Sequence, residues 1–263
     1  MTNILDRIIA NKRKEVAGHK EEQSIASIIN SLEKRSFTPH KDAFKNALKN
    51  SNTGIIAEFK RRSPSRDWIF KDAKTEDIIP PYSENGASAI SVLTDLDFFG
   101  GTLSDLETAR KLTATPLLRK DFVIDEYQLY QAALYGANAI LLIAAALTIN
   151  ETKQLATKAN ELGLDILLEI HNEKELDHIN DIVDVVGVNN RDLTSFVTDI
   201  QISFGLVDKI PAEFVKISES GISQPHTVKD LRAVGFEGFL MGENFMKTSN
   251  PGRALENFIK LIL

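Results

Sequence analysis

The stretch YGANAILLIA, residues 135–144, places a glycine shortly before a run of apolar residues. The same arrangement recurs in NGASAISVLT (85–94), ELGLDILLEI (161–170) and VGFEGFLMGE (234–243). A glycine at this place ends a helix in the left-handed conformation and lets the chain turn into the next strand. The recurring glycines, Gly86, Gly136, Gly163 and Gly235, therefore predict helix–turn–strand units along the chain.

Short apolar stretches extend this pattern over most of the sequence. Several are rich in β-branched residues and apolar at consecutive positions, as strands buried on both faces are. Between them, segments such as NETKQLATKANELGL (150–164) place Leu155, Ala159 and Leu162 on one helical face. Strand–helix alternation indicates parallel βα units. The predicted strands are Gly54–Phe59, Ser88–Leu93, Pro116–Leu118, Ala137–Ala144, Asp165–Ile170, Val185–Asn189, Phe214–Ser218 and Gly238–Met241.

The number of units decides the fold class. Eight βα units within one domain of ~250 residues fit an α/β fold of the closed (β/α)8 TIM-barrel type. A doubly wound open sheet is the weaker alternative, because the chain has no GxGxxG or GxxxxGK[ST] motif. Residues 1–50 precede the first strand and contain an amphipathic helix, Ile4–Val16. We therefore expect a single barrel domain over residues 1–263 with an N-terminal helical extension.

Composition and charge exclude several classes of protein. The 263 residues include no cysteine, which rules out disulfides, thiolate metal sites and cysteine nucleophiles and fits a cytoplasmic protein. A net charge of −6 gives no electrostatic footprint for nucleic acid. The N-terminus lacks the apolar core of a signal peptide, and the longest apolar run, ANAILLIAAAL (137–147), is shorter than the ~20 residues of a membrane span. We expect no nucleic-acid or membrane partner and favour a monomer.

Polar residues gather at the carboxyl ends of the predicted strands, where barrels of this type build their active sites. Taken singly, each has an ordinary explanation as a solvated loop, a salt bridge or a turn. Together, so many charges at one barrel mouth would cost desolvation energy unless they form a site. Lys60 and Lys120 are expected to lower each other's pKa. The residues are Glu58, Lys60, Lys120, Glu169, Asn189, Asn190, Arg191, Glu219, Ser220, Gly242 and Glu243.

Two glycines predict where a phosphate group binds. Gly221 and Gly242 follow the seventh and eighth strands, and glycine lets backbone N–H groups approach an anion closely. Barrels often bind phosphate there, at the N-terminus of a short extra helix. A single glycine is more often a turn, but the pair favours a small phosphorylated substrate.

At these residues the sequence resembles the indole-3-glycerol phosphate synthase family. The resemblance runs from about residue 55 to 247, and ILDRIIANKRKEVA (4–17) is similar to the family's opening helix. It implies a carboxy-lyase of tryptophan biosynthesis. The family cyclises 1-(2-carboxyphenylamino)-1-deoxyribulose 5-phosphate to indole-3-glycerol phosphate with loss of CO₂ and water, without cofactor or metal. The motifs are IIAEFKRRSPSR (55–66), ISVLTDLDFFGGTLSDL (90–106), TPLLRKDFVIDEYQLYQA (115–132), ILLEIHNEKEL (166–176), VVGVNNRDL (185–193), ISESGI (217–222) and LMGENFM (240–246).

The resemblance also implies roles for catalytic residues. Lys120 matches the general acid of ring closure, and Glu169 matches the general base. Lys60 matches a second catalytic lysine, which Glu58 would orient; which lysine serves which step stays open. Asn189 and Glu219 match polar residues that hold the substrate hydroxyls and the developing ring. The five histidines form no ligand cluster, so no metal site is expected, and His171 and His178 are expected on a helix surface.

The substrate-binding positions follow in the same way. Arg191 would face the anthranilate carboxylate, and Phe99 and Phe122 match aromatic contacts of the anthranilate ring. At residue 243 only the backbone N–H is expected to bind phosphate, with the carboxylate pointing away. The positions that match the phosphate site or flank it are Ser63, Ser220, Gly221, Gly242 and Glu243.

Two departures from the family pattern predict local changes. Asp67-Trp68 stands where the family commonly has glycine and an aliphatic residue, so Asp67 should take a glycine-like conformation and Trp68 should reshape the first loop. Pro80-Pro81 lies inside the first predicted barrel helix, which should kink or start again there.

Two other functions stay open. Phosphoribosylanthranilate isomerase, another phosphate-binding barrel, relies on a cysteine base that this chain lacks. A non-catalytic barrel that binds phosphate or anthranilate ligands is a different class, which the presence of Lys120 and Glu169 disfavours.

Overall fold

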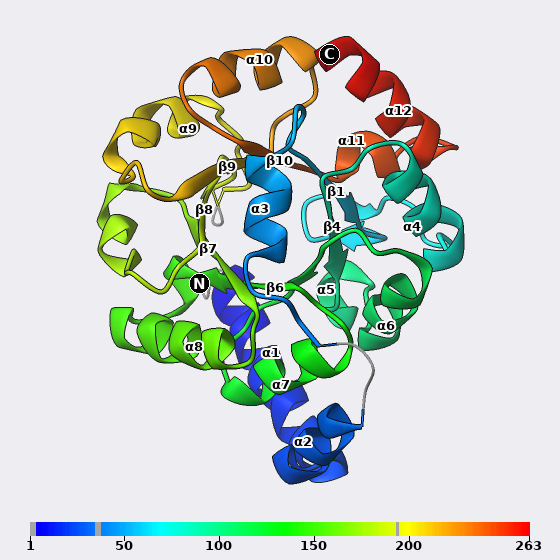
Figure 1. Ribbon diagram of the computed structural model, residues 1–263, viewed down its shortest axis with the longest axis vertical. Helices are drawn as coiled ribbons and strands as arrows, with labels where there is room; N and C mark the ends of the chain where they lie inside the picture. The colour runs from blue at the N-terminus through cyan, green and yellow to red at the C-terminus, as the bar shows by residue number, and fades with distance from the viewer. Residues whose placement is uncertain (1–3, 35–37, 193–194) are drawn as a thin grey trace.

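Eight parallel strands close into a barrel in the computed structural model, which describes residues 4–34, 38–192 and 195–263. Residues 1–3 and 35–37 of the predicted extension, and Leu193 of the motif VVGVNNRDL, lie outside these ranges. The closed (β/α)8 barrel expected from the sequence is confirmed, with all eight predicted strands in place (Figure 1). Around the barrel the strands follow the order β1 (Ile55–Phe59), β10 (Gly238–Met241), β9 (Val215–Glu219), β8 (Val185–Asn189), β7 (Asp165–Ile170), β6 (Ala139–Ile143), β5 (Leu117–Lys120) and β4 (Ala89–Leu93).

The strand β5 ends later than predicted. It continues through Arg119 and Lys120, which pair with β4 in parallel register. Backbone hydrogen bonds hold a strand together whatever its side chains are, so a charge does not end it when the side chain finds a partner. Side chains alternate between the faces of a strand, and Leu118 lies in the cluster that fills the barrel interior. Lys120, two residues further, therefore shares the inward face, whereas Arg119 does not.

Helices surround the strands, and a left-handed glycine follows four of them as predicted: Gly86, Gly136, Gly163 and Gly235 have φ between 73° and 109°. Figure 1 shows the outer ring of helices. No helix in the described part of the chain is long and apolar enough to cross a membrane. The helices after β1 are α4 (Thr75–Glu84), α5 (Leu96–Phe99), α6 (Leu103–Leu112), α7 (Glu126–Leu134), α8 (Ile149–Glu161), α9 (Gln201–Leu206), α10 (Pro225–Ala233), α11 (Glu243–Met246) and α12 (Pro251–Ile262), with 3-10 turns η1 (Ala144–Ala146), η2 (Glu173–His178) and η3 (Val207–Lys209).

The N-terminal extension consists of α1 (Ile4–Glu22), α2 (Ile25–Glu33) and α3 (Ala43–Lys49), so the first helix is longer than the predicted Ile4–Val16. The helix α3 covers the amino ends of the strands (Figure 1), where Phe44 and Leu48 join the barrel interior. Asp165, at the start of β7, accepts hydrogen bonds from the backbone N–H groups of Asp42, Phe44 and Lys45. This carboxylate satisfies donors at the start of α3 that the helix itself leaves without partners.

The first loop of the barrel forms a small hairpin in which β2 (Arg62–Ser63) pairs with β3 (Asp67–Trp68). Asp67 has φ 54°, which confirms the predicted glycine-like conformation. Trp68 lies against Gly100 of the next loop, where an added Cβ would come within 2.9 Å of the indole ring. Arg61 fixes the same neighbouring segment with two 2.7 Å hydrogen bonds to the Asp105 carboxylate. The first loop is thus packed against the loop after β4.

The first barrel helix was expected to kink or start again at its prolines, and the new start does not occur. The helix α4 runs through Pro80 and Pro81 as one element from Thr75 to Glu84. A proline removes the hydrogen bond to the carbonyl group four residues earlier, here those of Glu76 and Asp77. Both residues are exposed in the first turn, where water can hydrogen-bond to these carbonyl groups.

Candidate active site

Two adjoining cavities open at the carboxyl ends of the strands. The central cavity lies among the ends of the barrel strands and also contacts α1. The side cavity lies next to it, between the loops after β1, β8, β9 and β10. Residues that line both cavities include Glu58, Lys60, Ser65, Arg191 and Ser220. One elongated molecule can therefore span the two.

The structure brings nearly all of the predicted site residues to these cavities. Ser63 and Asn190 are the exceptions: both are buried and line neither cavity, whereas Ser65 lines both. Those that line the central cavity are Glu58, Lys60, Phe99, Lys120, Phe122, Glu169, Asn189, Arg191, Glu219 and Ser220. Those that line the side cavity are Glu58, Lys60, Arg191, Ser220, Gly221, Gly242 and Glu243.

Lys120 is held between two buried carboxylates. Its Nζ lies 3.1 Å from Glu169 Oε2 and 3.4 Å from Glu219 Oε2. Lys60 has a carboxylate partner of its own, because its Nζ donates to Glu58 Oε1 at 2.5 Å. The predicted pairing of Glu58 with Lys60 is thereby confirmed. Each lysine lies at the carboxyl end of a strand, and its positive charge is balanced by glutamates at the carboxyl ends of the barrel strands.

The expected lowering of the Lys120 pKa is wrong. Burial acts to lower it, but the charges of Glu169, Glu219 and Glu58 outweigh burial and raise the pKa of Lys120 above its ordinary value. Carboxylates close to the ammonium favour its charged form, and they lie on three different strands. The side chain of Lys120 is therefore charged near neutral pH.

The two glutamates beside Lys120 differ in pKa. Burial acts to raise the pKa of Glu169, but Lys120 and His171 outweigh it and hold this pKa well below its usual range. For Glu219 the balance is reversed. Burial raises its pKa to about 7; Lys120 opposes this shift, and the charges of Glu169 and Glu58 add to it. Near neutral pH, Glu169 is therefore ionised, whereas Glu219 exchanges between its two protonation states.

His171 is a functional candidate that sequence reasoning placed wrongly. It was expected on a helix surface, but it follows β7 directly and its side chain is only 10 % exposed. Its Nε2 lies 3.3 Å from Glu169 Oε1. The signal was present in the sequence, because residues 169 and 171 share one face of an extended strand end.

The side cavity is lined by several cationic side chains and by two glycines, Gly221 and Gly242. Besides Lys60 and Arg191 it includes Arg66 and Lys247, which the sequence had not suggested. The predicted short helix is confirmed as α11, with Gly242 directly before it. This arrangement favours an anionic group.

Both glycines of this cavity are required by their surroundings. Gly221 has φ 76°, and a Cβ added there would lie 2.5 Å from Thr198 Cγ2. A Cβ at Gly242 would lie 2.6 Å from Glu58 Oε1 and would push into the carboxylate that holds Lys60. The glycine at 242 thus lets the loop after β10 lie directly against the catalytic candidate Glu58.

The carboxylate of Glu243 was expected to point away from the side cavity, but it does not. Its Oε1 lies 3.2 Å from Arg66 Nε, and its Oε2 lies 3.8 Å from Arg191 Nη2. Two guanidinium groups on facing loops lie within reach of the side chain, so the carboxylate turns toward them. Glu243 therefore connects the first loop to the loop after β8.

The apolar side of the central cavity combines two aromatic rings with the N-terminal helix. Phe99 and Phe122 lie with ring centroids 5.9 Å apart. Ile4, Leu5 and Ile8 of α1 line the same cavity. Sequence reasoning treated this helix as a mere extension, although its apolar face was visible. This wall is suited to a flat aromatic group.

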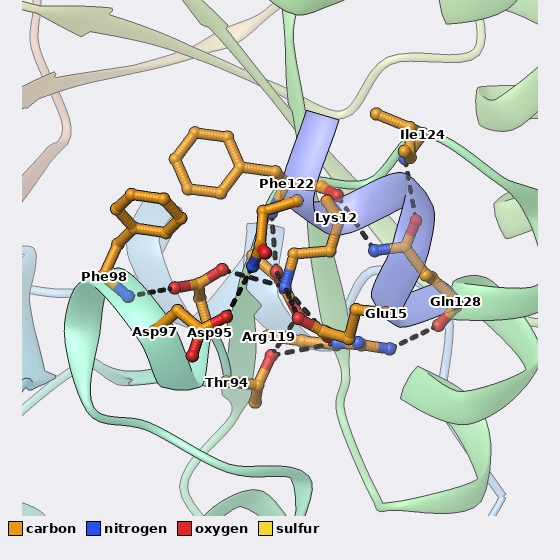
Figure 2. A network of polar contacts seen from close by, with 12 residues as sticks. Lys12, Glu15, Thr94, Asp95, Asp97, Phe98, Arg119, Phe122, Ile124 and Gln128 are labelled. Atoms are coloured by element: carbon orange, nitrogen blue, oxygen red, sulfur yellow. Dashed lines mark hydrogen bonds and ion pairs between the residues drawn. The ribbon is translucent and has the colours of Figure 1, made fainter. Parts of the chain in front are cut away.

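A buried ion network lies directly behind this wall. Lys12 of α1 is fully buried, with Nζ 2.9 Å from Asp95 Oδ2 and 2.8 Å from Asp121 Oδ1 (Figure 2). Asp121 also accepts from Arg119 Nη2 at 2.9 Å, and Arg119 Nη1 donates to the carbonyl oxygen of Gln128 at 2.6 Å. Arg119 and Asp121 thus anchor the end of β5 on both sides of Lys120.

Comparison with known proteins gives one consistent family. Residues 5–258 match the family model described as indole-3-glycerol phosphate synthase. The indole-3-glycerol phosphate synthase of Bacteroides thetaiotaomicron is 53 % identical over 262 residues, covering 100 % of both chains. That of Dechloromonas aromatica is 40 % identical over 260 residues, covering 97 % of this chain and 98 % of the relative.

Solved structures agree on the fold. The tryptophan synthase subunit alpha of Legionella pneumophila superposes with a TM-score of 0.62 at 13 % identity, covering 84 % of this chain and 98 % of that one. A mutant of the tryptophan synthase alpha-subunit of Pyrococcus furiosus gives a TM-score of 0.60 at 15 % identity, covering 80 % of this chain and 97 % of that one. At such identities the likeness concerns the barrel alone.

Proposed function

The chain belongs to the indole-3-glycerol phosphate synthase family, and from that premise we propose how its two cavities carry out the family's reaction of tryptophan biosynthesis. The substrate, 1-(2-carboxyphenylamino)-1-deoxyribulose 5-phosphate, has an aromatic acid at one end and a phosphate at the other. The central cavity takes the carboxyphenyl ring against Phe99 and Phe122. The side cavity takes the phosphate near Gly221 and Gly242. Their shared lining places the reacting sugar carbons beside the lysines.

Ring closure is assigned to Lys120. The aryl carbon that bears the carboxylate attacks the ketone carbon, and the ketone oxygen takes a proton as its negative charge develops. The ammonium of Lys120, kept charged by Glu169 and Glu219, supplies that proton and stabilises the developing charge. The carboxylate then leaves as CO₂, and its bonding electrons restore the aromatic ring.

Dehydration completes the reaction. A hydroxyl group leaves as water after it receives a proton, and loss of a proton from the ring system to Glu169 forms the indole. The cavity provides two lysines for the two proton donations, because Lys60 lines both cavities and is oriented by Glu58. Asn189 and Arg191 line the central cavity where the substrate's hydroxyls and carboxylate would lie.

One observation carries the proposal: a charged lysine lies between two buried carboxylates of unequal pKa, in a cavity continuous with a cation-lined one. An environment that moves the pKa values of two carboxyl groups apart is typical of acid–base catalysis. A barrel that only bound ligands would gain nothing from holding a lysine and two carboxyl groups together out of water.

The test is an assay of the purified chain with the carboxyphenylamino-deoxyribulose phosphate, without added metal or cofactor. We expect the fluorescence of the indole product to rise, and chromatography should identify the product as indole-3-glycerol phosphate. Tight binding of the substrate without turnover would favour the alternative, a non-catalytic barrel that binds phosphate or anthranilate ligands. Absence of both binding and turnover would contradict the use of these cavities altogether.

We also propose that the enzyme acts as a monomer in the cytoplasm. The residues of one chain are enough to line both cavities, and a chain without cysteines needs no oxidising compartment. Light scattering after size exclusion should give one 29.2 kDa chain, and activity per chain should not change on dilution. A dimer whose dissociation abolishes activity would contradict this.

A further inference from the structure

His171 occupies a place between the site and the outside of the barrel that the reaction scheme does not use. It lines neither cavity, so it does not touch substrate directly. Its Nε2 lies 3.3 Å from Glu169 Oε1, and its Nδ1 lies 3.1 Å from Glu175 Oε2 in η2. Its backbone N–H donates to the same Glu175 oxygen at 2.7 Å. The ring is therefore fixed between a catalytic candidate and an outer carboxylate.

The surroundings of the ring favour its charged form. Nδ1 is hydrogen-bonded to the Glu175 carboxylate, which can only accept, and Nε2 lies at ion-pair distance from Glu169 Oε1 although it makes no hydrogen bond among the described residues. Burial acts to lower the pKa of His171, but its contacts with Glu169 and Glu175 outweigh burial and raise it to about 10. The ring is therefore a cation throughout the neutral range.

The contact distinguishes the two glutamates that flank Lys120. Both are almost completely buried, and one oxygen of each lies close to Lys120 Nζ. They differ at the other oxygen. Glu169 Oε1 lies 3.3 Å from His171 Nε2, an ion-pair contact in which Nε2 makes no hydrogen bond, whereas Glu219 Oε1 has no hydrogen-bond partner among the described residues. Two buried carboxylates so close together cannot both ionise freely, and the one with a second cation keeps its charge.

We propose that His171 is a positioning residue that selects Glu169, rather than Glu219, as the ionised base of the pair. Its cation compensates Glu169 from behind and keeps the other oxygen turned toward Lys120. Glu219, which lacks such a cation, is left as the member of the pair that carries a proton. The proposal rests on the assignment of Glu169 as the base.

The charges around this pair come from every neighbouring strand end. Lys120 faces Glu169 from β5, and Glu219 faces it from β9 across the same lysine. Glu58 of β1 adds its charge to Lys120 and Glu219. Glu175 of η2 faces only the outer nitrogen of the ring. His171 is thus the cation that acts on Glu169 without acting directly on Glu219.

The first experiment compares kcat and KM of the wild-type enzyme and the variant His171→Gln between about pH 5 and pH 9. A base must be deprotonated to act, and loss of the cation raises the pKa of Glu169. The acid limb of the kcat profile, which lies below the measured range in the wild type, should therefore move up into it, and the relative loss should shrink as the pH rises. We expect kcat to fall about tenfold at pH 5 and to be nearly unchanged at pH 8, with KM changed less than about threefold at both.

The matched control is His178→Gln. This histidine lies in η2, and its Nδ1 contacts Thr152 Oγ1 at 2.8 Å instead of a carboxylate. Its profile should superpose on that of the wild type. Glu175→Gln, which removes only the outer carboxylate, should shift the acid limb in the same direction by less. An unmoved acid limb in His171→Gln would overturn the proposal, whatever its effect on stability.

A second measurement does not depend on turnover. In protein with ¹⁵N-labelled histidine, the chain gives signals from only five rings, and the one missing in His171→Gln identifies residue 171. Both of its ring nitrogens should keep imidazolium shifts up to about pH 8, and Glu169→Gln should lower that limit. A neutral ring at pH 7 would overturn the proposal. An inactive wild type with a charged ring would instead contradict the proposed function alone.

Discussion

Two groups of buried charges meet at the end of β5, and they have opposite character. The helix cluster is formed by Lys12, Glu15, Asp95, Arg119 and Asp121. The cavity cluster is formed by Glu58, Lys60, Lys120, Glu169 and Glu219. Arg119, Lys120 and Asp121 are consecutive in sequence, yet the middle residue belongs to one cluster and its two neighbours belong to the other.

The difference lies in what the charges face. In the helix cluster, Lys12 Nζ lies within 2.9 Å of three carboxylates and Asp121 also pairs with Arg119; Asp95 Oδ2 makes no hydrogen bond among the described residues but lies 2.9 Å from Lys12 Nζ. In the cavity cluster, Glu58, Lys60, Lys120, Glu169 and Glu219 all line the central cavity, and Glu219 Oε1 has no hydrogen-bond partner among the described residues. Charges that are packed against their partners hold structure together, whereas charges that line a cavity are available for chemistry.

The largest expected effect is on kcat, and it comes from a substitution that breaks the cavity cluster. Lys120→Met should lower kcat by at least about a thousandfold, because ring closure loses both its proton donor and its charge stabilisation. Calorimetry should show substrate affinity within a few-fold of wild type, since the side cavity is unchanged. Lys111→Met, on the exposed face of α6, is the control and should be fully active. Turnover like that of the wild type in Lys120→Met would remove it from the mechanism.

Breaking the helix cluster should mainly lower the free energy of unfolding. Lys12→Met leaves the buried Asp95 without its cation and takes one of two cations from Asp121, and removal of one partner of a buried ion pair typically costs about 3–5 kcal/mol. Lys14→Met changes an exposed lysine of the same helix in the same way and should cost little. Urea unfolding of both variants measures the contrast. Equal stability of the two would mean that α1 is held by its apolar face alone.

The pH dependence of stability should differ in sign between the two glutamates. The pKa of Glu219 is raised to about 7 in the folded protein, so its contribution is fully present below about pH 4.3 and is lost as the pH rises through 7. Glu219→Gln should therefore gain stability relative to wild type between pH 5 and 8, by about 2–3 kcal/mol.

Glu169→Gln should do the opposite. The folded-state pKa of Glu169 is lowered, so its stabilising contribution is present above about pH 4.3, and the variant should be less stable than wild type at neutral pH. Thermal unfolding across this pH range tests both variants. Parallel curves for the two would contradict the unequal charge states on which the acid–base assignment rests.

A charge placed in the side cavity should act on binding. Gly221→Asp should raise KM about ten- to a hundredfold through repulsion of the phosphate. Gly221→Asn is the matched control, because both side chains meet Thr198 and both tolerate the positive φ of 76°. The ratio of the two KM values isolates the charge. A ratio near one would place the phosphate elsewhere.

The smallest effect concerns the ion pairs of Glu243. Glu243→Gln frees Arg66 and Arg191 to face the phosphate, so KM should fall about two- to threefold. The effect is small because the Arg66 side chain is 67 % exposed, and exposed ion pairs are weak. Glu256→Gln removes a comparable surface pair on α12 and should leave KM unchanged. A rise in KM would show that the carboxylate helps to position the arginines.

The sequence by itself determined the barrel and the positions of most site residues. Glycines before apolar runs, and apolar runs at regular spacing, are local signals that do not depend on what lies across the molecule. The alternation of side chains along a strand then puts the last inward residue of each strand at the barrel mouth. Glu58, Lys120 and Glu169 could therefore be identified as site residues before any coordinates.

Apart from the pair of Glu58 and Lys60, tertiary structure alone decided how these charges are paired. The burial of Lys12, the contact of His171 with Glu169 and the turn of Glu243 toward Arg66 and Arg191 all join segments far apart along the chain or depend on side-chain orientation. The pKa of a carboxylate depends on burial and on charges within a few ångströms, which periodicity does not encode. Two glutamates that look alike in sequence thus become an ionised carboxylate and a group that titrates near pH 7.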